Sequence, residues 1–274
     1  MADISRKDAW TLLKSATSAR IGLGRSGDAM PLDAVLDFQH AHARARDAVH
    51  AKVDFDAISA ALETPTLHTL HISSATQDRA TYLRRPDLGR ILHADSEAAL
   101  KDAVHAADII LVVADGLSAA AVQAHSVPLL KALVPRLTDF VIGPVLLATR
   151  GRVALGDHIG EILQPKLIAM LIGERPGLSV AESLGVYLTY APRLGRQDSE
   201  RNCISNIHGK GGLGYEDAAG KIAWLTREAL RRSLTGIHLK EDASAQLSAA
   251  PGNDSALLSS ETPEIDEHDE RLKQ

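Results

Sequence analysis

Four short stretches of this 274-residue chain carry charged, hydroxyl or thiol side chains, most of them beside glycine. Their sequences are DGLS at 115–118, RGRV at 150–153, GERPGL at 173–178 and CISNIH at 203–208. The first three directly follow apolar runs, and the fourth lies in the longer stretch after another. Glycine lets the backbone approach a ligand closely, and the polar groups beside it can form hydrogen bonds. The pattern favours a cofactor site, although glycine and proline also serve simply to turn a chain.

The sequence does not favour a nucleophilic catalytic site or a metal-binding site. The single cysteine, Cys203, has no evident base, so a small residue that contacts a ligand is the favoured interpretation. No G-x-S-x-G turn is present, and Ser118 is better explained as a helix N-cap. The twelve histidines include no H-E-x-x-H pair, and His68 and His71 would lie on opposite faces of a strand. We therefore predict no catalytic residue and no metal ligand in this chain.

Two stretches, at 22–27 and 209–214, match the dinucleotide fingerprint G-x-G-x-x-G. The first follows a helical segment instead of a strand, and the second lies too near the end of the expected sheet for a βαβ unit. A phosphate loop is absent, because Gly220 and Lys221 are followed by Ile222. A free-standing nicotinamide-dependent oxidoreductase on a Rossmann-like sheet is the alternative function, and it lacks its expected fingerprint.

An alternation of strands and helices after residue 65 can position these stretches. Apolar runs lie at 67–73, 109–114, 141–148, 167–173 and 186–190, and helical segments at 96–106, 118–133, 157–163, 179–184 and 216–234. Continuous apolar strands between helices are typical of a parallel sheet covered on both faces. Its carboxyl edge is where ligands bind. We predict an α/β fold, with a helical N-terminal part followed by a Rossmann-like doubly wound, mainly parallel sheet.

Three regions are expected along the chain. Residues 1–65 form a helical N-terminal region, with helices near 8–14, 31–50 and 56–62, and residues 66–240 form the Rossmann-like domain. Residues 241–274 contain nine acidic and two basic residues, which predicts a disordered acidic tail. Pro31 suits the first position of the second helix. The apolar residues that lie on one face of that helix are Leu32, Val35, Leu36 and Val49.

The composition excludes several classes of protein. The net charge of the whole chain is −5, and that of the last 34 residues is −7. Residues 1–240 therefore have a net charge of only +2 and lack the basic character of nucleic-acid binders. No apolar run approaches the ~20 residues that span a bilayer, and the N-terminus lacks a secretion signal. One cysteine cannot form a disulfide framework. We expect a cytoplasmic protein that binds neither nucleic acid nor membrane.

Several unusual stretches, matching in order and spacing over about residues 10–236, resemble one known family. The most specific are GERPGL and CISNIH. The others are TSAR at 17–20, GRSG at 24–27, YLRRPDLGR at 82–90, DGLS at 115–118, GRV at 151–153, DHIGEIL at 157–163, ESL at 182–184 and YAPR at 190–193. By these stretches the chain resembles the small (light) subunit of adenosylcobalamin-dependent ethanolamine ammonia-lyase.

The resemblance implies a division of labour between two kinds of subunit. The large subunit of this family is a TIM barrel that binds substrate and carries the radical conversion of ethanolamine to acetaldehyde and ammonia. The small subunit helps to enclose adenosylcobalamin at the interface, in a hetero-oligomer of large–small pairs, and is inactive alone. The cobalamin-contacting positions of the family fall on Val153, Glu174 and Cys203.

The coordination of cobalt and the cellular location complete the expectations. Many cobalamin proteins supply a histidine ligand from D-x-H-x-x-G, but the sequence from Asp157 and His158 to Gly160 lacks the intervening residue. We therefore expect a base-on cofactor, with its own dimethylbenzimidazole on cobalt and no lower ligand from this chain.

Many relatives carry a long N-terminal extension that directs them to a bacterial microcompartment. The extension is expected to be absent here, which favours the cytoplasm and leaves the compartment as an alternative.

Overall fold

The computed structural model describes residues 10–103 and 106–240. The acidic tail predicted at 241–274 lies outside the described residues. Within the described ranges, no helix combines the length and the apolar character needed to cross a membrane.

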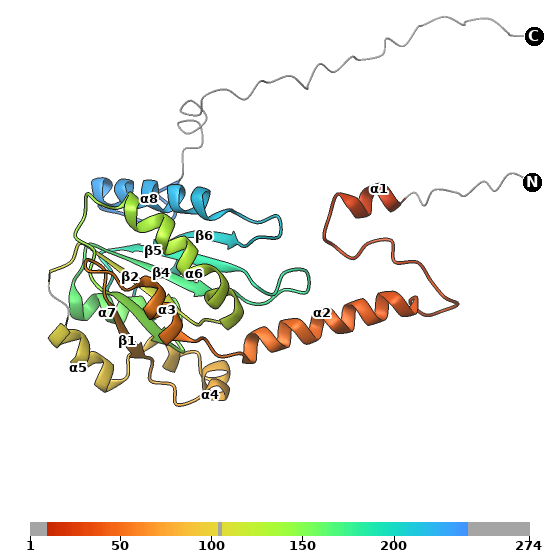
Figure 1. Cartoon of the computed structure of the whole chain (residues 1–274), viewed down its shortest axis with the longest axis horizontal. Helices are drawn as coiled ribbons and strands as arrows, with labels where there is room; N and C mark the ends of the chain where they lie inside the picture. The colour runs from red at the N-terminus through yellow and green to blue at the C-terminus, as the bar shows by residue number, and fades with distance from the viewer. Residues whose placement is uncertain (1–9, 104–105, 241–274) are drawn as a thin grey trace, which may run out of the picture. The chain divides into compact units, whose positions relative to one another are not determined.

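A six-stranded sheet forms the centre of the described chain (Figure 1). Its strands are β1 (Thr69–Ser73), β2 (Ile109–Ala114), β3 (Val145–Thr149), β4 (Leu167–Gly173), β5 (Leu184–Tyr190) and β6 (Asn202–Ile207). Their order in the sheet is β1-β3-β2-β4-β5-β6. The first four run parallel, whereas β5 is antiparallel to β4 and β6 is antiparallel to β5. The predicted α/β class and mainly parallel sheet are thus confirmed.

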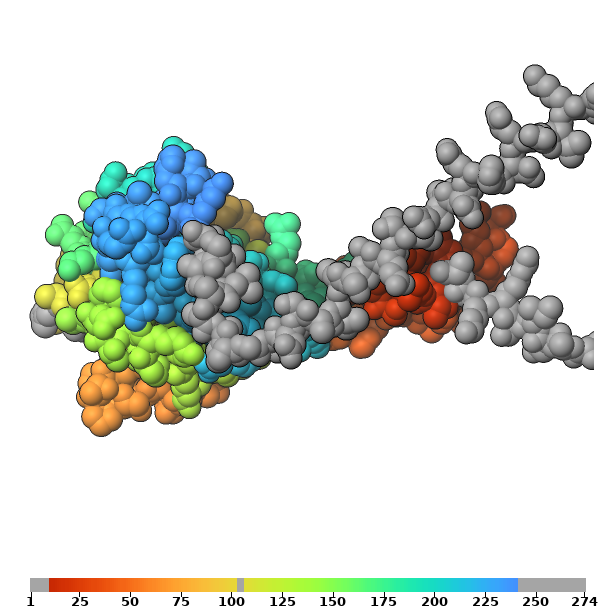
Figure 2. All heavy atoms as spheres, turned by 90° about the horizontal axis from the view of Figure 1, so that it is seen from above, coloured from red at the N-terminus to blue at the C-terminus, as the bar shows by residue number. Residues whose placement is uncertain are grey.

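Helices cover both faces of this sheet (Figure 1). The helices α3 (Phe55–Leu62), α6 (Ala119–Leu133) and α8 (Tyr215–Arg232) pack on one face, and α5 (Ala94–Ala103) and α7 (Leu155–Leu163) pack on the other. Figure 2 shows α8, in blue, beside α6, in yellow-green. Side chains of β2 alternate between two cores, since Ile109 joins the first and Ile110 the second. Burial on both faces explains why β2 is a continuous apolar run.

The winding of the chain reverses at β2. Strand β3 lies on one side of β2 and β4 on the other, and α6 and α7, which follow β2 and β3, cover opposite faces. At such a switch point the loops leaving neighbouring strands diverge and leave a crevice outside their carboxyl ends. The sheet therefore places the loops after β2, β3 and β4 around one crevice.

Polar side chains determine where several helices begin. The Ser118 hydroxyl accepts the N–H of Ala121 at 3.2 Å, which confirms the predicted N-cap of α6. Asp54 and Asp78 cap α3 and α4 (Arg79–Arg84) in the same way. Three 3-10 turns complete the described elements, namely η1 (Leu88–Arg90), η2 (Val134–Arg136) and η3 (Asp198–Glu200).

The N-terminal region is helical, as the pattern predicts, with α1 (Trp10–Ser15) and α2 (Leu32–His50) before α3. The expected apolar face of α2 is not its buried face, however. Leu32 and Leu36 are 72% and 54% exposed, whereas Ala41 and Ala48 are buried. Small side chains lie where α2 packs closely, and the larger apolar ones are left accessible to solvent.

Three expectations for residues 174–208 are wrong. The helix predicted at 179–184 is a loop, because its backbone groups bond to distant partners: Ser118 Oγ donates to the Ala181 carbonyl at 2.8 Å. The following strand is antiparallel to β4, since the loop at 174–183 is shorter than the dozen or more residues of a parallel crossover. The stretch CISNIH is largely the edge strand β6, whose exposed polar residues resemble a loop in sequence.

Candidate functional site

The loops after β2 and β4 touch backbone to backbone at the carboxyl edge. Leu117 N–H donates to the Gly173 carbonyl at 2.9 Å, and Gly116 has a left-handed φ of 57°. A Cβ atom at Gly173 would collide with the carbonyl of Ser118, and one at Gly116 with the carbonyl of Gly173. Glycine at these two positions therefore lets the loops meet, which places Glu174 directly beside the end of β2.

Two cavities adjoin at this edge. The first, of about 500 Å³, is lined by residues that follow β2, β3 and β4 and includes Val153 and Glu174. The second, of about 410 Å³, includes Val153 and extends toward the turn at η3. Arg152 and Tyr187 also line both. The structure thus brings Val153 and Glu174 into one cavity, at the edge where the strand pattern predicts a ligand.

Glu174 is held by hydroxyl and backbone donors, not by an arginine. Ser205 Oγ donates to its Oε1 at 2.5 Å, and Ser183 Oγ donates to Oε2 at 2.6 Å. Asn206 N–H lies 3.4 Å from Oε2. These bonds join the loop after β4 to the end of β6 and aim the carboxylate along the cavity wall. A carboxylate has about four acceptor sites, so capacity remains for a ligand.

Cys203 lies on β6, opposite Tyr187 of β5, and not on a loop as the sequence predicts. Partial desolvation, reinforced by the charge of Glu174, raises the pKa of the Cys203 thiol, which therefore stays protonated at neutral pH. A neutral thiol is a poor nucleophile. Cys203 lines neither cavity itself; its cross-strand neighbour Tyr187 lines both.

Tyr82 supports the loop that carries Val153. Its buried hydroxyl donates to the Gly151 carbonyl at 3.0 Å, and the guanidinium of Arg152 lies 4.2 Å from its ring centroid. Arg152 Nη2 also donates to the Tyr82 carbonyl at 3.0 Å. A Cβ atom at Gly89 would lie 2.7 Å from the Arg152 side chain, so glycine is needed there too. Tyrosine, arginine and glycine together fix the position of the loop.

A second arginine, Arg79, meets a buried carboxylate behind the first cavity. Its Nη1 donates to the Gly116 carbonyl at 2.8 Å and lies 3.5 Å from Asp115 Oδ2. Asp115 is 8% exposed, and its Oδ1 has no hydrogen-bond partner among the described residues. Burial raises the pKa of Asp115 to about 6, against the opposing attraction of Arg79. Between about pH 4 and pH 6, Asp115 is therefore protonated in the folded chain and ionised in the unfolded chain.

We expect Asp115→Asn to stabilise the chain at neutral pH. Because the pKa of Asp115 is higher in the folded chain than in the unfolded chain, the free energy of unfolding decreases as the pH rises from about 4 to about 6. Ionised Asp115 then costs at most about 3 kcal/mol, the equivalent of about two pKa units. Urea titrations should give a more stable variant at pH 7 and equal stabilities near pH 4. The exposed Asp28→Asn serves as control, and an unchanged pH slope in Asp115→Asn would contradict the assignment.

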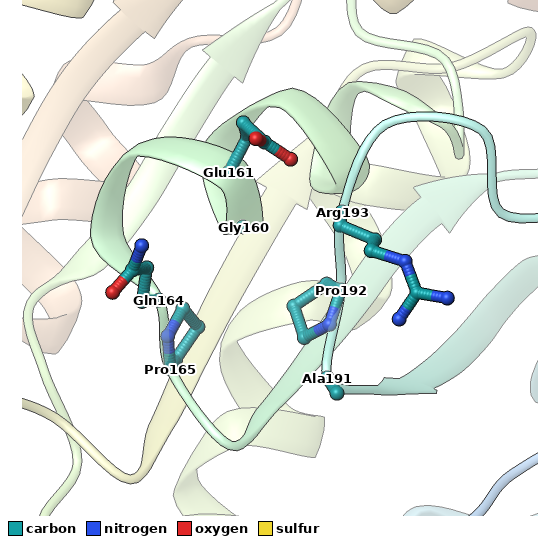
Figure 3. Close-up of a pocket in the computed structure, with 7 residues that line it drawn as sticks. All are labelled: Gly160, Glu161, Gln164, Pro165, Ala191, Pro192 and Arg193. Atoms are coloured by element: carbon teal, nitrogen blue, oxygen red, sulfur yellow. The ribbon is translucent and has the colours of Figure 1, made fainter.

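A separate hollow lies at the opposite edge of the sheet (Figure 3). It has a volume of about 330 Å³ and is lined by residues from the end of α7, including Glu161, and by Ala191 to Arg193 after β5. Pro165 in its wall directly precedes β4, whereas Glu174 directly follows that strand. The hollow therefore contains none of the predicted site residues.

Comparison with known proteins identifies the family. A family model described as Ethanolamine ammonia-lyase light chain (EutC) matches residues 7–240. The chain belongs to the ethanolamine ammonia-lyase light-chain family. The ethanolamine ammonia-lyase small subunit of Pseudomonas fluorescens is 46% identical over 258 residues, which cover 92% of this chain and 94% of the relative. The small subunit of Bradyrhizobium diazoefficiens is 53% identical over 234 residues, covering 84% and 89%.

Membership in the light-chain family confirms the resemblance read from the sequence. It also decides against the nicotinamide alternative, and the two glycine stretches agree with this decision. Residues 22–27 lie between α1 and α2, and residues 209–214 lie between β6 and α8, so neither follows β1. In this light chain the glycines of the loops after β2 and β4 serve close backbone contact instead.

Several residues of the light-chain site were not predicted individually. Tyr187 lines both cavities, and Ser183 and Ser205 orient Glu174. Tyr82 and Arg152 form the wall behind Val153. Most of these residues lie inside the family stretches, which was the available signal, but their roles depend on contacts between distant segments.

Proposed function

We propose that this small subunit of an ethanolamine ammonia-lyase binds adenosylcobalamin together with a large TIM-barrel subunit. The observation that carries the proposal is the gathering of Val153, Glu174 and Tyr187 around adjoining cavities at the switch point of the sheet, with Cys203 paired to Tyr187 across the strands. Family membership supports the reaction class, and the geometry supports this edge of the sheet as the place where the cofactor binds.

The chemistry of the cavity wall fits a corrinoid. The corrin ring carries amide side chains, which both donate and accept hydrogen bonds. Glu174 retains acceptor capacity, and Arg152 Nε is a buried donor without a partner among the described residues. The small side chain of Val153 leaves room for a broad planar ring. Adenosylcobalamin is larger than either cavity, which supports a site completed by a second subunit.

The role of this chain is to bind, orient and shield. Adenosylcobalamin supplies the radical chemistry when bound. The loops after β2, β3 and β4 exclude water from one side of it, which protects reactive species from side reactions. His158 Nδ1 accepts the N–H of Leu92 at 3.0 Å, away from the cavities, which supports a base-on cofactor without a lower ligand from this histidine.

Exposed apolar side chains in the N-terminal region support a large partner. Eight of the thirteen exposed large apolar side chains of the described residues lie between Trp10 and Phe38. Patches of this kind mark protein–protein contacts more often than free surface. We infer that the large subunit covers part of residues 10–38. We also propose a cytoplasmic location, because a chain with one cysteine suits a reducing compartment.

Reconstitution tests the proposed function. The isolated chain should produce no acetaldehyde from ethanolamine, since no acid–base or nucleophile pair lines the cavities. Adding the large subunit and adenosylcobalamin should produce turnover, and the complex should retain the visible spectrum of the corrin after gel filtration. Turnover by the isolated chain, or a complex that binds no corrin, would contradict the assigned roles.

A further inference from the structure

The cavity beside Val153 is lined by arginines that lack carboxylate partners. Arg90 and Arg152 line the cavity of about 410 Å³, and neither forms an ion pair with a described residue. Arg175 lines the adjoining cavity and also has no such pair among them. Three unpaired guanidinium groups around two adjoining cavities create a local excess of positive charge, which attracts an anion.

The carboxylates that line the same cavities, Glu174 and Asp198, offset part of this charge, but neither forms an ion pair with these arginines. Glu174 accepts hydrogen bonds from serine hydroxyls, and Asp198 lies 3.4 Å from Arg201 Nε. A fourth arginine of the same cavity, Arg196, is different, because it pairs with Glu200 and donates to backbone carbonyls. Arg90 and Arg152, unlike Arg196, thus have no carboxylate partner among the described residues.

Arg152 is held ready for a ligand by its surroundings. Its guanidinium lies over the Tyr82 ring, and one Nη2 bond to the Tyr82 carbonyl fixes its plane. Its Nε is buried without a hydrogen-bond partner, which is costly unless another group completes the site. Arg90 is an exposed residue at the end of η1 and adds a second, more adaptable donor at the rim. A planar guanidinium matches the oxygens of a phosphate group.

We propose that Arg90 and Arg152 bind the phosphodiester of the adenosylcobalamin nucleotide tail. The inference rests on the proposed function. The phosphodiester is the anionic group of the cofactor, whereas the amides of the corrin ring are neutral. Since the two cavities share Val153 and Tyr187, a corrin beside Glu174 can extend its tail into the arginine-lined cavity. Arg175 lines the cavity proposed for the corrin ring, not the one proposed for the tail.

A pair of corrinoids that differ by one phosphate tests the proposal. Adenosylcobinamide ends in an alcohol, and adenosylcobinamide phosphate carries a phosphate ester on the same group. Dissociation constants for both, and for adenosylcobalamin, are measured by visible absorbance titration of the complex with the large subunit. The unaltered complex should bind the phosphate ester about tenfold more tightly, as charge-assisted hydrogen bonds predict.

Arg90→Gln provides the decisive variant, because its exposed side chain makes no described bond whose loss would unfold the chain. The preference for the phosphate ester should fall to about threefold or less, with adenosylcobinamide affinity unchanged and partial recovery in Arg90→Lys. Arg193→Gln, at the hollow of the opposite edge, is the matched control and should keep the full preference.

The outcomes separate this inference from the proposed function. Equal affinities for the two corrinoids in the unaltered complex, or an equal loss for both in Arg90→Gln, would overturn the phosphate assignment. Equal losses would instead indicate that Arg90 contacts the large subunit. A complex that binds none of the three corrinoids would overturn the proposed function itself.

Discussion

Replacing Arg201 with methionine should lower the free energy of unfolding by about 3–5 kcal/mol, the range expected when one partner of a buried ion pair is removed. Arg201 donates two parallel hydrogen bonds to Asp157, at 2.7 and 2.6 Å, and the two residues are 7% and 3% exposed. Without the guanidinium, the Asp157 carboxylate remains buried and uncompensated. Urea denaturation of the purified variant measures the loss.

The double variant Arg201→Met/Asp157→Leu separates the ion pair from simple packing. Apolar residues of similar volume often replace a buried pair at little cost, so much of the lost stability should return. Arg85→Met, at an exposed pair with Asp87, is the matched control and should cost less than about 1 kcal/mol. A double variant as unstable as Arg201→Met would show that Arg201 stabilises the chain through its other contacts.

The ion pair also bears on the site. Arg201 directly precedes β6, and it donates to Thr189 Oγ1 at 2.9 Å and to the Arg196 carbonyl at 3.1 Å. It therefore ties the start of β6 to α7 and β5. Because Cys203 lies two residues later, loss of Arg201 should also weaken cobalamin binding by the complex.

Glu174→Gln should lower the affinity of the complex for adenosylcobalamin by about tenfold to a hundredfold. The substitution keeps the shape of the side chain but removes its charge, and hydrogen bonds to charged groups contribute about 1.5–3 kcal/mol. The amide NH2 also meets one of the two serine hydroxyls that donate to the carboxylate. Corrin absorbance titration of the complex measures the affinity.

Ser183→Ala is the matched control, because it removes one donor to Glu174 and leaves the carboxylate in place. If Glu174 binds the cofactor directly, Ser183→Ala should lower the affinity far less than Glu174→Gln. If Glu174 only joins the loop after β4 to β6, both substitutions should lower the melting temperature of the apo complex alike and affect affinity equally. Unchanged affinity in Glu174→Gln would remove this residue from the site.

The sequence predicts that the loops carrying Val153 and Glu174 lie at the carboxyl ends of buried strands, and the structure places both loops there. An apolar run followed by glycine and polar residues indicates both the strand and its carboxyl end, and parallel strands bring such ends together. The choice of Val153, Glu174 and Cys203 as individual site residues came from the family resemblance. The segment of Cys203 differs from the other two in its structure. Only Ile204 and Ile207 are buried in this edge strand, because a register shift interrupts the alternation, and the exposed polar residues between them resemble a loop.

The direction of β5 was the main error, and its signal was present in the sequence. Residues 174–183 are too few for a helical crossover, so β5 had to return antiparallel to β4. An apolar run indicates burial but carries no information on strand direction. The predicted helix at 179–184 failed for a related reason, because Ser118 and His125 bond its backbone from α6.

By itself, the sequence determined the α/β class, the buried strands and the loops at their carboxyl ends, because burial and turn formation depend on local residue types. Only the tertiary structure decided which groups complete the site. Glu174 meets Ser205, and Tyr187 meets Cys203, through the antiparallel pairing of β5 and β6. Arg152 forms no ion pair with a described residue, because its guanidinium packs on the ring of Tyr82 and donates to the Tyr82 carbonyl, seventy positions away in the sequence. Such pairings depend on strand order and direction, which side-chain periodicity does not encode.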